Sequence, residues 1–119
     1  MAGSHDDAML IVELSKLGAM LGLPEVARSI FAEEFDPDSV ELADPGVQKM
    51  LNFFETVATL VTNDLLDRDL VHDWVWVGGI WERLGPAAKR ARERTGFAGL
   101  FENVEALAAG SASGIAHPS

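Results

Sequence analysis

The stretch MLNFFETVATLV, residues 50–61, is the densest apolar run in the chain and decides the fold. On a wheel of about 100° per residue, segment 47–65 places its apolar side chains in one broad arc. These are Val47, Met50, Leu51, Phe53, Phe54, Val57, Ala58, Leu60, Val61 and Leu65. The polar side chains fill the other arc. The pattern therefore predicts an amphipathic helix with one face in the core.

Asn52 and Glu55 interrupt this apolar run, and two interpretations of them stay open. Both side chains could face water, or neighbours could shelter the polar arc. The periodic placement of both residues favours the first. The low charge supports the second, because only Lys49 and Glu55 are charged there, whereas a solvated helix face usually carries many charges. A sheltered Glu55 needs a hydrogen-bond donor. The candidate donors are Arg83, Arg90 and Arg94.

Helical patterns also cover most of the remaining chain. We predict helices over residues 7–21, 24–35 and 45–66, from 67 or 69 to 84, over 87–95 and over 97–110. Asp44 followed by Pro45 is typical of a helix start, and Gly85-Pro86 and Gly96 are expected to end helices. The predicted fold class is all-α, a compact bundle of five or six helices without a sheet.

The segment VHDWVWVGG, residues 71–79, alternates as a strand would. A helix is favoured because apolar residues repeat at spacings of four and three over a longer range. These residues are Leu70, Trp74, Val77, Trp81 and Leu84. Trp76 and Ile80 point away from this stripe. They are either an exposed interface anchor or a pair covered by a neighbouring helix. Gly78-Gly79 either permits close helix contact or marks a kink.

Length and composition indicate one domain. The chain has 119 residues, of which 48% are hydrophobic, and we place a single helical domain at residues 7–109. Residues 1–6 are expected to be a flexible N-terminus or an expression tag, and residues 110–119 a disordered tail. The chain has no cysteine, which excludes disulfides and thiol chemistry and suits a cytoplasmic location. It also lacks the ~18 consecutive apolar residues of a membrane span.

The chain has a net charge of −10, and its charged residues are unevenly distributed along the sequence. Acidic residues concentrate in 33–44 and basic residues in 83–94. The acidic segment lacks the glycine and glutamate spacing of a calcium-binding loop, and the basic segment has no interleaved aromatic residues. We expect the two segments to attract each other, within one chain or across a dimer.

Catalytic patterns are sparse. His72 is the only histidine outside the chain ends, so one chain cannot form a multi-histidine site. The Glu-x-x-His repeats of di-iron bundles, nucleophile elbows and phosphate-binding glycine loops do not occur. We therefore expect no enzyme activity, no cofactor and no bound metal.

Several short segments nevertheless resemble a family of small bacterial and phage proteins known only as a domain of unknown function. They are Leu51 to Glu55, Leu65 to Asp67, the Trp-x-x-Leu-x-Pro step from Trp81 to Pro86, Arg90 to Arg94, and Phe101 to Leu107. The resemblance covers residues 49–108 and implies an all-helical domain without assigned activity. It also suggests that Asn52 and Glu55 bond the basic helix and orient it.

The sequence leads to one main functional hypothesis and two alternatives. The main one is a non-catalytic helical interaction module that forms a homodimer or binds another protein. The first alternative is a regulatory domain that binds a small ligand or effector beside Asn52, Glu55, Trp76 and the arginines. The weaker alternative is a nucleic-acid-associated regulator that uses Arg83 to Arg94, although the acidic charge opposes that partner.

Overall fold

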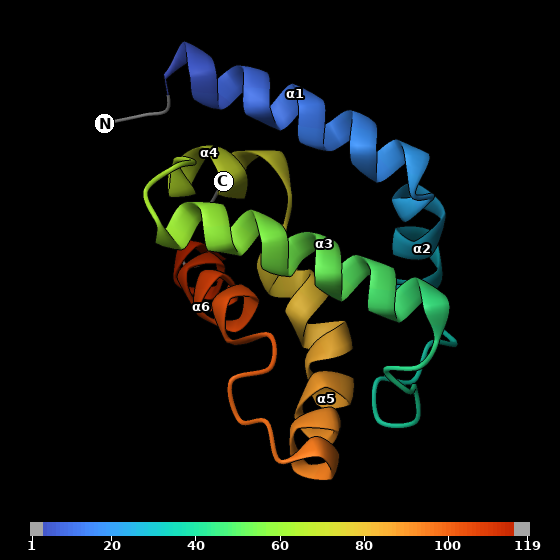
Figure 1. Ribbon diagram of the computed structural model, residues 1–119. Coiled ribbons are helices and arrows are strands. Elements are labelled where there is room, and N and C mark those ends of the chain that lie inside the picture. Colours follow the sequence, from blue (N-terminus) through green and yellow to red (C-terminus); the bar gives the residue numbers. More distant parts are fainter. Residues whose placement is uncertain (1–3, 116–119) are drawn as a thin grey trace.

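The computed structural model describes residues 4–115, with side chains described through residue 110. This part contains six helices and no strand (Figure 1). The helices are α1 (His5–Met20), α2 (Leu23–Ile30), α3 (Pro45–Thr62), α4 (Arg68–Trp74), α5 (Val77–Thr95) and α6 (Glu102–Ile115). The predicted all-α fold class is confirmed.

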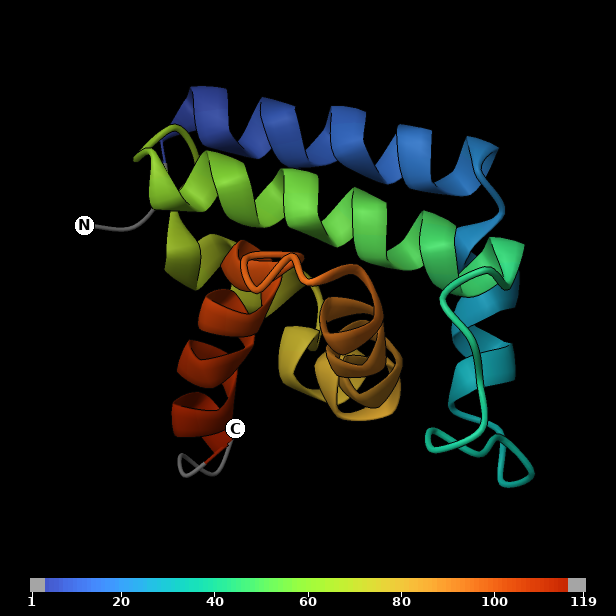
Figure 2. The same ribbon diagram turned by 60° about the horizontal axis from the view of Figure 1, so that its bottom comes forward.

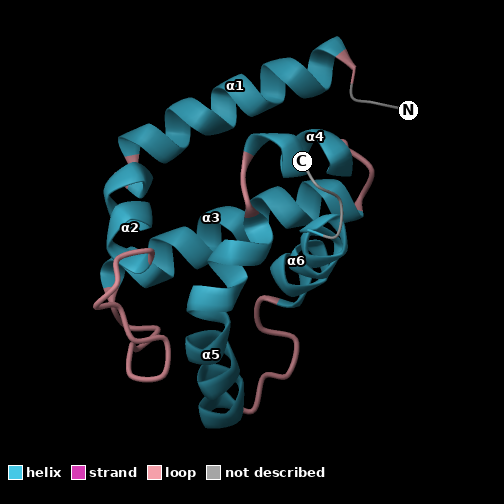
Figure 3. Ribbon diagram, turned by 180° about the vertical axis from the view of Figure 1, so that it is seen from behind, coloured by secondary structure: helices cyan, strands magenta, loops and turns pink. Residues whose placement is uncertain are grey.

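Helix α3 is the central element of the fold. Helices α5 and α6 pack against it and against each other, while α1 runs along its other side (Figure 2). Helix α2 leads away from the end of α1, and the long α2–α3 loop lies beside α5 (Figure 3). Helix α1 is therefore the outermost element, and the figures draw no helix beyond it.

The apolar arc of α3 supplies much of the core, as its sequence predicts. Eight of its side chains are buried, and Leu51, Val57 and Ala58 have no exposed surface. Burying each large apolar side chain contributes about 1.5–3 kcal/mol relative to leaving it exposed. The apolar face of α3 therefore explains why α2, α5 and α6 pack against this helix.

The predicted start of α3 is confirmed, but its predicted end at Leu66 is wrong. The Asp44 side chain accepts hydrogen bonds from Gly46 N and Val47 N and caps the first turn. The helix ends at Thr62, and Asp64 follows with a φ of 59°. Leu65 consequently leaves the predicted core arc and is 61% exposed.

Segment 67–84 is not one helix, so the predicted continuous stripe is wrong. Val75 is extended, with φ −141° and ψ 152°, and separates α4 from α5. The Trp76 ring folds back over Gly79, where an added Cβ would lie 2.4 Å from ring atom Cε3. Gly79 therefore makes room for a tryptophan ring, which differs from both predicted roles of the glycine pair.

Gly85-Pro86 does not end a helix either, because Pro86 lies inside α5. A proline normally clashes with the Cβ of the residue before it. Gly85 has no Cβ, so this clash is absent. Gly96 ends the helix as predicted, with a left-handed φ of 74°.

Both ends of the folded domain differ from the predicted bounds at residues 7 and 109. Ser4 and Asp7 form a capping box that starts α1 at His5, within the segment predicted to be flexible. Helix α6 begins at Glu102, five residues later than predicted, and continues over residues 110–115 of the predicted disordered tail. Residues 1–3 and 116–119 lie outside the described residues. Within residues 4–115, no helix combines the length and apolar character needed to cross a bilayer.

Candidate functional site

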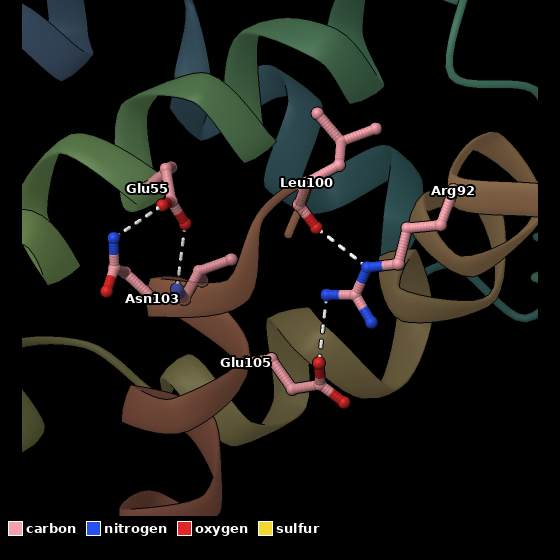
Figure 4. A network of polar contacts seen from close by, with 6 residues as sticks. Glu55, Arg92, Leu100, Asn103 and Glu105 are labelled. Carbon is pink, nitrogen blue, oxygen red and sulfur yellow. Dashed lines mark hydrogen bonds and ion pairs between the residues drawn. The ribbon is translucent and has the colours of Figure 1, made fainter. Parts of the chain in front are cut away.

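Glu55 lies at the contact between α3 and the first turn of α6 (Figure 4). One carboxylate oxygen accepts from the backbone amide of Val104 at 2.9 Å, and the other accepts from Asn103 Nδ2 at 2.9 Å. Val104 is the third residue of α6, so its amide has no partner within that helix. The carboxylate also suits the positive end of the helix dipole. Glu55 thus caps a helix that lies 47 residues further along the chain.

The polar arc of α3 is divided between neighbours and solvent. Thr62 Oγ1 lies 3.4 Å from Asn103 Oδ1, beside the Glu55 contact. Asn52 is exposed, and its side chain makes no hydrogen bond with the described residues, while its backbone carbonyl accepts from Thr56 Oγ1 at 3.0 Å. Each of the two interpretations of the polar arc therefore holds for one residue: Glu55 is sheltered and Asn52 faces solvent.

The predicted pairing of Glu55 with an arginine is wrong. Arg83 donates to Ala32 O at 3.3 Å and lies over the Phe35 ring. Arg90 donates to Pro37 O at 3.2 Å and to Val40 O. Arg94 pairs with Glu41 at 3.6 Å. All three side chains hold the α2–α3 loop, so the suggestion that Asn52 and Glu55 orient the basic helix is wrong as well.

Arg92 is the arginine that faces α6. Its Nε donates to Leu100 O at 2.8 Å, and its Nη2 lies 2.8 Å from Glu105 Oε1 (Figure 4). The guanidinium also lies over the Trp81 ring. On a wheel of about 100° per residue, Arg92 points opposite to the three loop-facing arginines. This opposite placement follows from the sequence alone and could have identified Arg92 as the arginine that faces away from the loop.

The attraction predicted between the acidic and basic segments occurs within the chain. Between segments 33–44 and 83–94, both fully described, the one ion pair between side chains is Arg94–Glu41, and both side chains are more than half exposed. Such exposed pairs contribute about 0–1 kcal/mol. Arg83 and Arg90 instead donate to backbone carbonyls of the loop. The basic segment therefore acts mainly by satisfying the loop backbone.

Trp76 and Ile80 do not form an exposed pair. Ile80 is 6% exposed and belongs to the core, so the alternative in which a neighbour covers it applies. Trp76 is 54% exposed and stacks on Phe31, with ring centroids 6.1 Å apart and planes 8° apart. Trp76 is therefore an exposed aromatic side chain, and its role in an interface stays a prediction.

His72 is partly buried between α4 and α6. A Cβ at Gly110 would lie 3.4 Å from its Nε2, and neither ring nitrogen has a hydrogen-bond partner among the described residues. Burial lowers the pKa of His72 below 6.5, and Arg68 lowers it further, while Asp69 and Asp73 act in the opposite direction. In the described residues no group of three metal-ligating side chains comes together.

The outward side of α1 carries four exposed apolar side chains that the sequence reasoning missed, together with the exposed ion pair of Glu13 and Lys16. Met20 is 84% exposed, Met9 49%, Val12 46% and Leu17 44%. Only Leu14 and Gly18 of this helix are buried. The signal in the sequence was the presence of apolar residues all around the wheel, which is typical of a helix with neighbours on two sides. We call Met9, Val12, Leu17 and Met20 the α1 outer face.

An apolar groove lies on the opposite side of α1. Its volume is about 230 Å³, and its walls include Leu14, Gly18, Leu23, Phe53, Phe54 and Trp74. The groove does not include the residues expected to bind a ligand, because Glu55 faces α6 and the arginines face the α2–α3 loop. The predicted ligand-site residues are therefore not brought together.

The fold and these contacts define a small all-helical domain whose polar network joins its own helices. Residues 6–111 match the family described as Domain of unknown function (DUF4760), and the chain belongs to that family. Comparison with curated proteins and with solved structures gives no match. The polar network joins two segments on which the resemblance rests, since Glu55 ends the first and Asn103 lies in the last.

Proposed function

We propose that this domain is a non-catalytic interaction module that binds a second copy of itself. The observation that carries the proposal is the α1 outer face, where four large apolar side chains are 44–84% exposed on one helix. Contiguous exposed apolar patches on a domain of this size often mark interaction sites. Association removes this apolar surface from water, which is the usual driving force of protein contacts.

The rest of the molecule supports an interaction role over a chemical one. The charged groups singled out by the sequence stabilise the fold: Glu55 caps α6, and Arg83 and Arg90 hold the α2–α3 loop. Because these arginines already have partners within the chain, the contacts do not favour nucleic-acid binding. A cytoplasmic location and a bacterial or phage origin stay predictions.

Sedimentation velocity or light scattering over a wide concentration range tests self-association. We expect the average mass to rise from that of a monomer towards that of a dimer. Met20→Glu should keep the protein monomeric, because a charge placed in the contact would be desolvated. Phe97→Glu is the matched control, since Phe97 is 61% exposed in the α5–α6 loop. A wild-type chain that stays monomeric at millimolar concentration contradicts the proposal.

A second candidate function is the binding of a small apolar ligand in the groove behind α1. The largely apolar walls favour it, but a volume of about 230 Å³ is below the ~300–1,000 Å³ of most ligand sites. A thermal-shift series with short fatty acids and aromatic alcohols tests it, because a ligand selective for the folded state raises Tm. Gly18→Leu should fill the groove and abolish the shift. Shifts that persist in this variant argue against the site.

A further inference from the structure

We infer that the hollow between α5 and α6 binds a guanidinium group, carried by a small molecule or by an arginine side chain of a partner protein. The hollow has a volume of about 350 Å³, and its walls include Trp76, Trp81, Glu82 and Glu105. This volume lies within the ~300–1,000 Å³ of most ligand sites. The inference goes beyond the proposed self-association and does not depend on it, because the hollow is lined by α5, α6 and the residue before α5.

Small residues leave the space between the two packed helices open. Gly78 lies three residues before Trp81 on α5, while Ala108 and Ala109 lie three and four residues after Glu105 on α6. Residues at these spacings share one face of a helix. Each helix therefore presents a small residue beside a large one, and the hollow forms where the small residues of α5 and α6 meet.

Two of the lining residues already bind a guanidinium group of the chain itself. The guanidinium carbon of Arg92 lies 5.7 Å from the centroid of the Trp81 ring, and its Nη2 lies 2.8 Å from Glu105 Oε1 (Figure 4). A planar guanidinium can stack on an aromatic ring while its N–H groups pair with a carboxylate. A tryptophan beside a glutamate is therefore a combination that binds guanidinium at this place in the fold.

Trp76 and Glu82 repeat this combination in the same hollow without a cation from the chain. Trp76 is 54% exposed. Glu82 is exposed and forms no ion pair with the described residues. Because Arg92 compensates the charge of Glu105, Glu82 leaves the lining with a net negative charge. The net charge of −10 on the whole chain also favours the approach of a cation.

The Trp76 ring is held in place by the fold. It stacks on Phe31 with the ring planes 8° apart, and the absence of a Cβ at Gly79 makes room for it. A side chain that is already positioned loses little conformational freedom when a ligand binds.

The expected binding is nevertheless weak, because both contacts lie near the surface. An exposed cation–π contact and an exposed ion pair each strengthen binding by only about two- to fivefold. We therefore expect a single guanidinium group to bind with a Kd in the millimolar range. A peptide that carries the group can gain further contacts around the hollow.

Titration of the full chain with N-acetylarginine amide tests the site, with the NMR signals of the three tryptophan indole N–H groups as the readout. We expect the Trp76 signal to move most and the Trp74 signal to stay, because Trp74 lines the groove behind α1 instead. N-acetylcitrulline amide is the matched control ligand, since a neutral urea replaces its guanidinium. Equal shifts with both compounds, or a shift confined to Trp74, would overturn the inference.

Substitutions in the lining test the contacts. Glu82→Gln and Trp76→Leu should each raise the Kd of N-acetylarginine amide by about two- to fivefold. Glu93→Gln is the matched control, because Glu93 is exposed on the same helix and its substitution changes the net charge equally. Ala109→Met should weaken binding by filling the hollow without a change of charge. Equal weakening in Glu82→Gln and Glu93→Gln would show a general charge effect and overturn the site.

A further comparison distinguishes the two sources of the guanidinium group. Agmatine represents a free small molecule, and a capped Gly-Ser-Arg-Ser-Gly peptide represents a partner protein. A lower Kd for the peptide assigns the hollow to an arginine side chain, and a lower Kd for agmatine assigns it to a small molecule. Absence of binding by all three guanidinium compounds at millimolar concentration would overturn the inference.

The outcomes are separable from those for self-association. Met20→Glu should bind N-acetylarginine amide as the wild type does, because Met20 lies on α1 and not in the hollow. A chain that stays monomeric therefore leaves this inference in place. Circular dichroism of each variant checks the fold, which should be retained because all substituted residues are exposed.

Discussion

Glu55 is the residue whose role is clearest, because its carboxylate completes the hydrogen bonding of another helix. Both oxygens are used, one by the Val104 amide and one by the Asn103 side chain. Hydrogen bonds to a charged group contribute about 1.5–3 kcal/mol. Asn52, one turn earlier on α3, is exposed and makes no side-chain hydrogen bond with the described residues. We therefore expect these two polar residues of one segment to have different effects on stability.

We expect Glu55→Ala to lower the free energy of unfolding by about 1–3 kcal/mol, because it leaves the Val104 amide without its acceptor. Urea denaturation measures this change. Asn52→Ala is the matched control and should change stability by less than about 0.5 kcal/mol. Equal effects of the two substitutions would show that the carboxylate does not cap α6 in solution.

His72 should make stability depend on pH. Its folded-state pKa is lowered, chiefly by burial, so between that pKa and 6.5 the unfolded chain binds more protons than the folded chain. Stability should therefore be full above pH 6.5 and fall as the pH decreases below it. His72→Leu should flatten the urea midpoint between pH 5 and 7 relative to wild type. An unchanged slope would contradict the burial of the neutral imidazole.

Among the helices, α5 joins two parts of the fold. Its loop-facing arginines hold the α2–α3 loop, and Arg92 on its opposite side holds the start of α6. Pro86 lies in the middle of this helix. A proline there removes one backbone hydrogen bond and costs up to ~3 kcal/mol relative to alanine.

Pro86→Ala should therefore raise the free energy of unfolding by about 1–3 kcal/mol, because the backbone hydrogen bond to the preceding turn is regained. Thermal and urea unfolding both measure this gain. Ala88→Gly, a substitution in the same helix that leaves the proline in place, should destabilise the protein. A loss of stability in Pro86→Ala would contradict this expectation and would show that the proline stabilises the contacts of α5 with its two neighbours.

In the assembled fold, α1 has apolar side chains on both of its sides. One side packs against the domain through Leu14 and Gly18, and the other is the α1 outer face. A monomer leaves that second side in water. The stability of the protein should therefore depend on its own concentration if a second copy covers this surface.

The melting temperature should rise with protein concentration in the wild type, since dimer formation stabilises the folded state by mass action. In Met20→Glu the melting temperature should be independent of concentration. Differential scanning calorimetry at several concentrations compares the two proteins. The Phe97→Glu control should behave as the wild type does. A wild-type melting temperature that does not change with concentration would contradict dimerisation.

The helical class, the two-sided character of α3 and its capped start at Asp44 can be predicted from local patterns, because these features depend on residues three or four positions apart. The contacts between helices could not be predicted from any local pattern. In the tertiary structure Glu55 bonds the α6 amide instead of an arginine, the helix is interrupted at Val75, and one side of α1 is uncovered. The physical reason is that a helix forms from contacts within about one turn, whereas the partner of a side chain depends on which helices pack together.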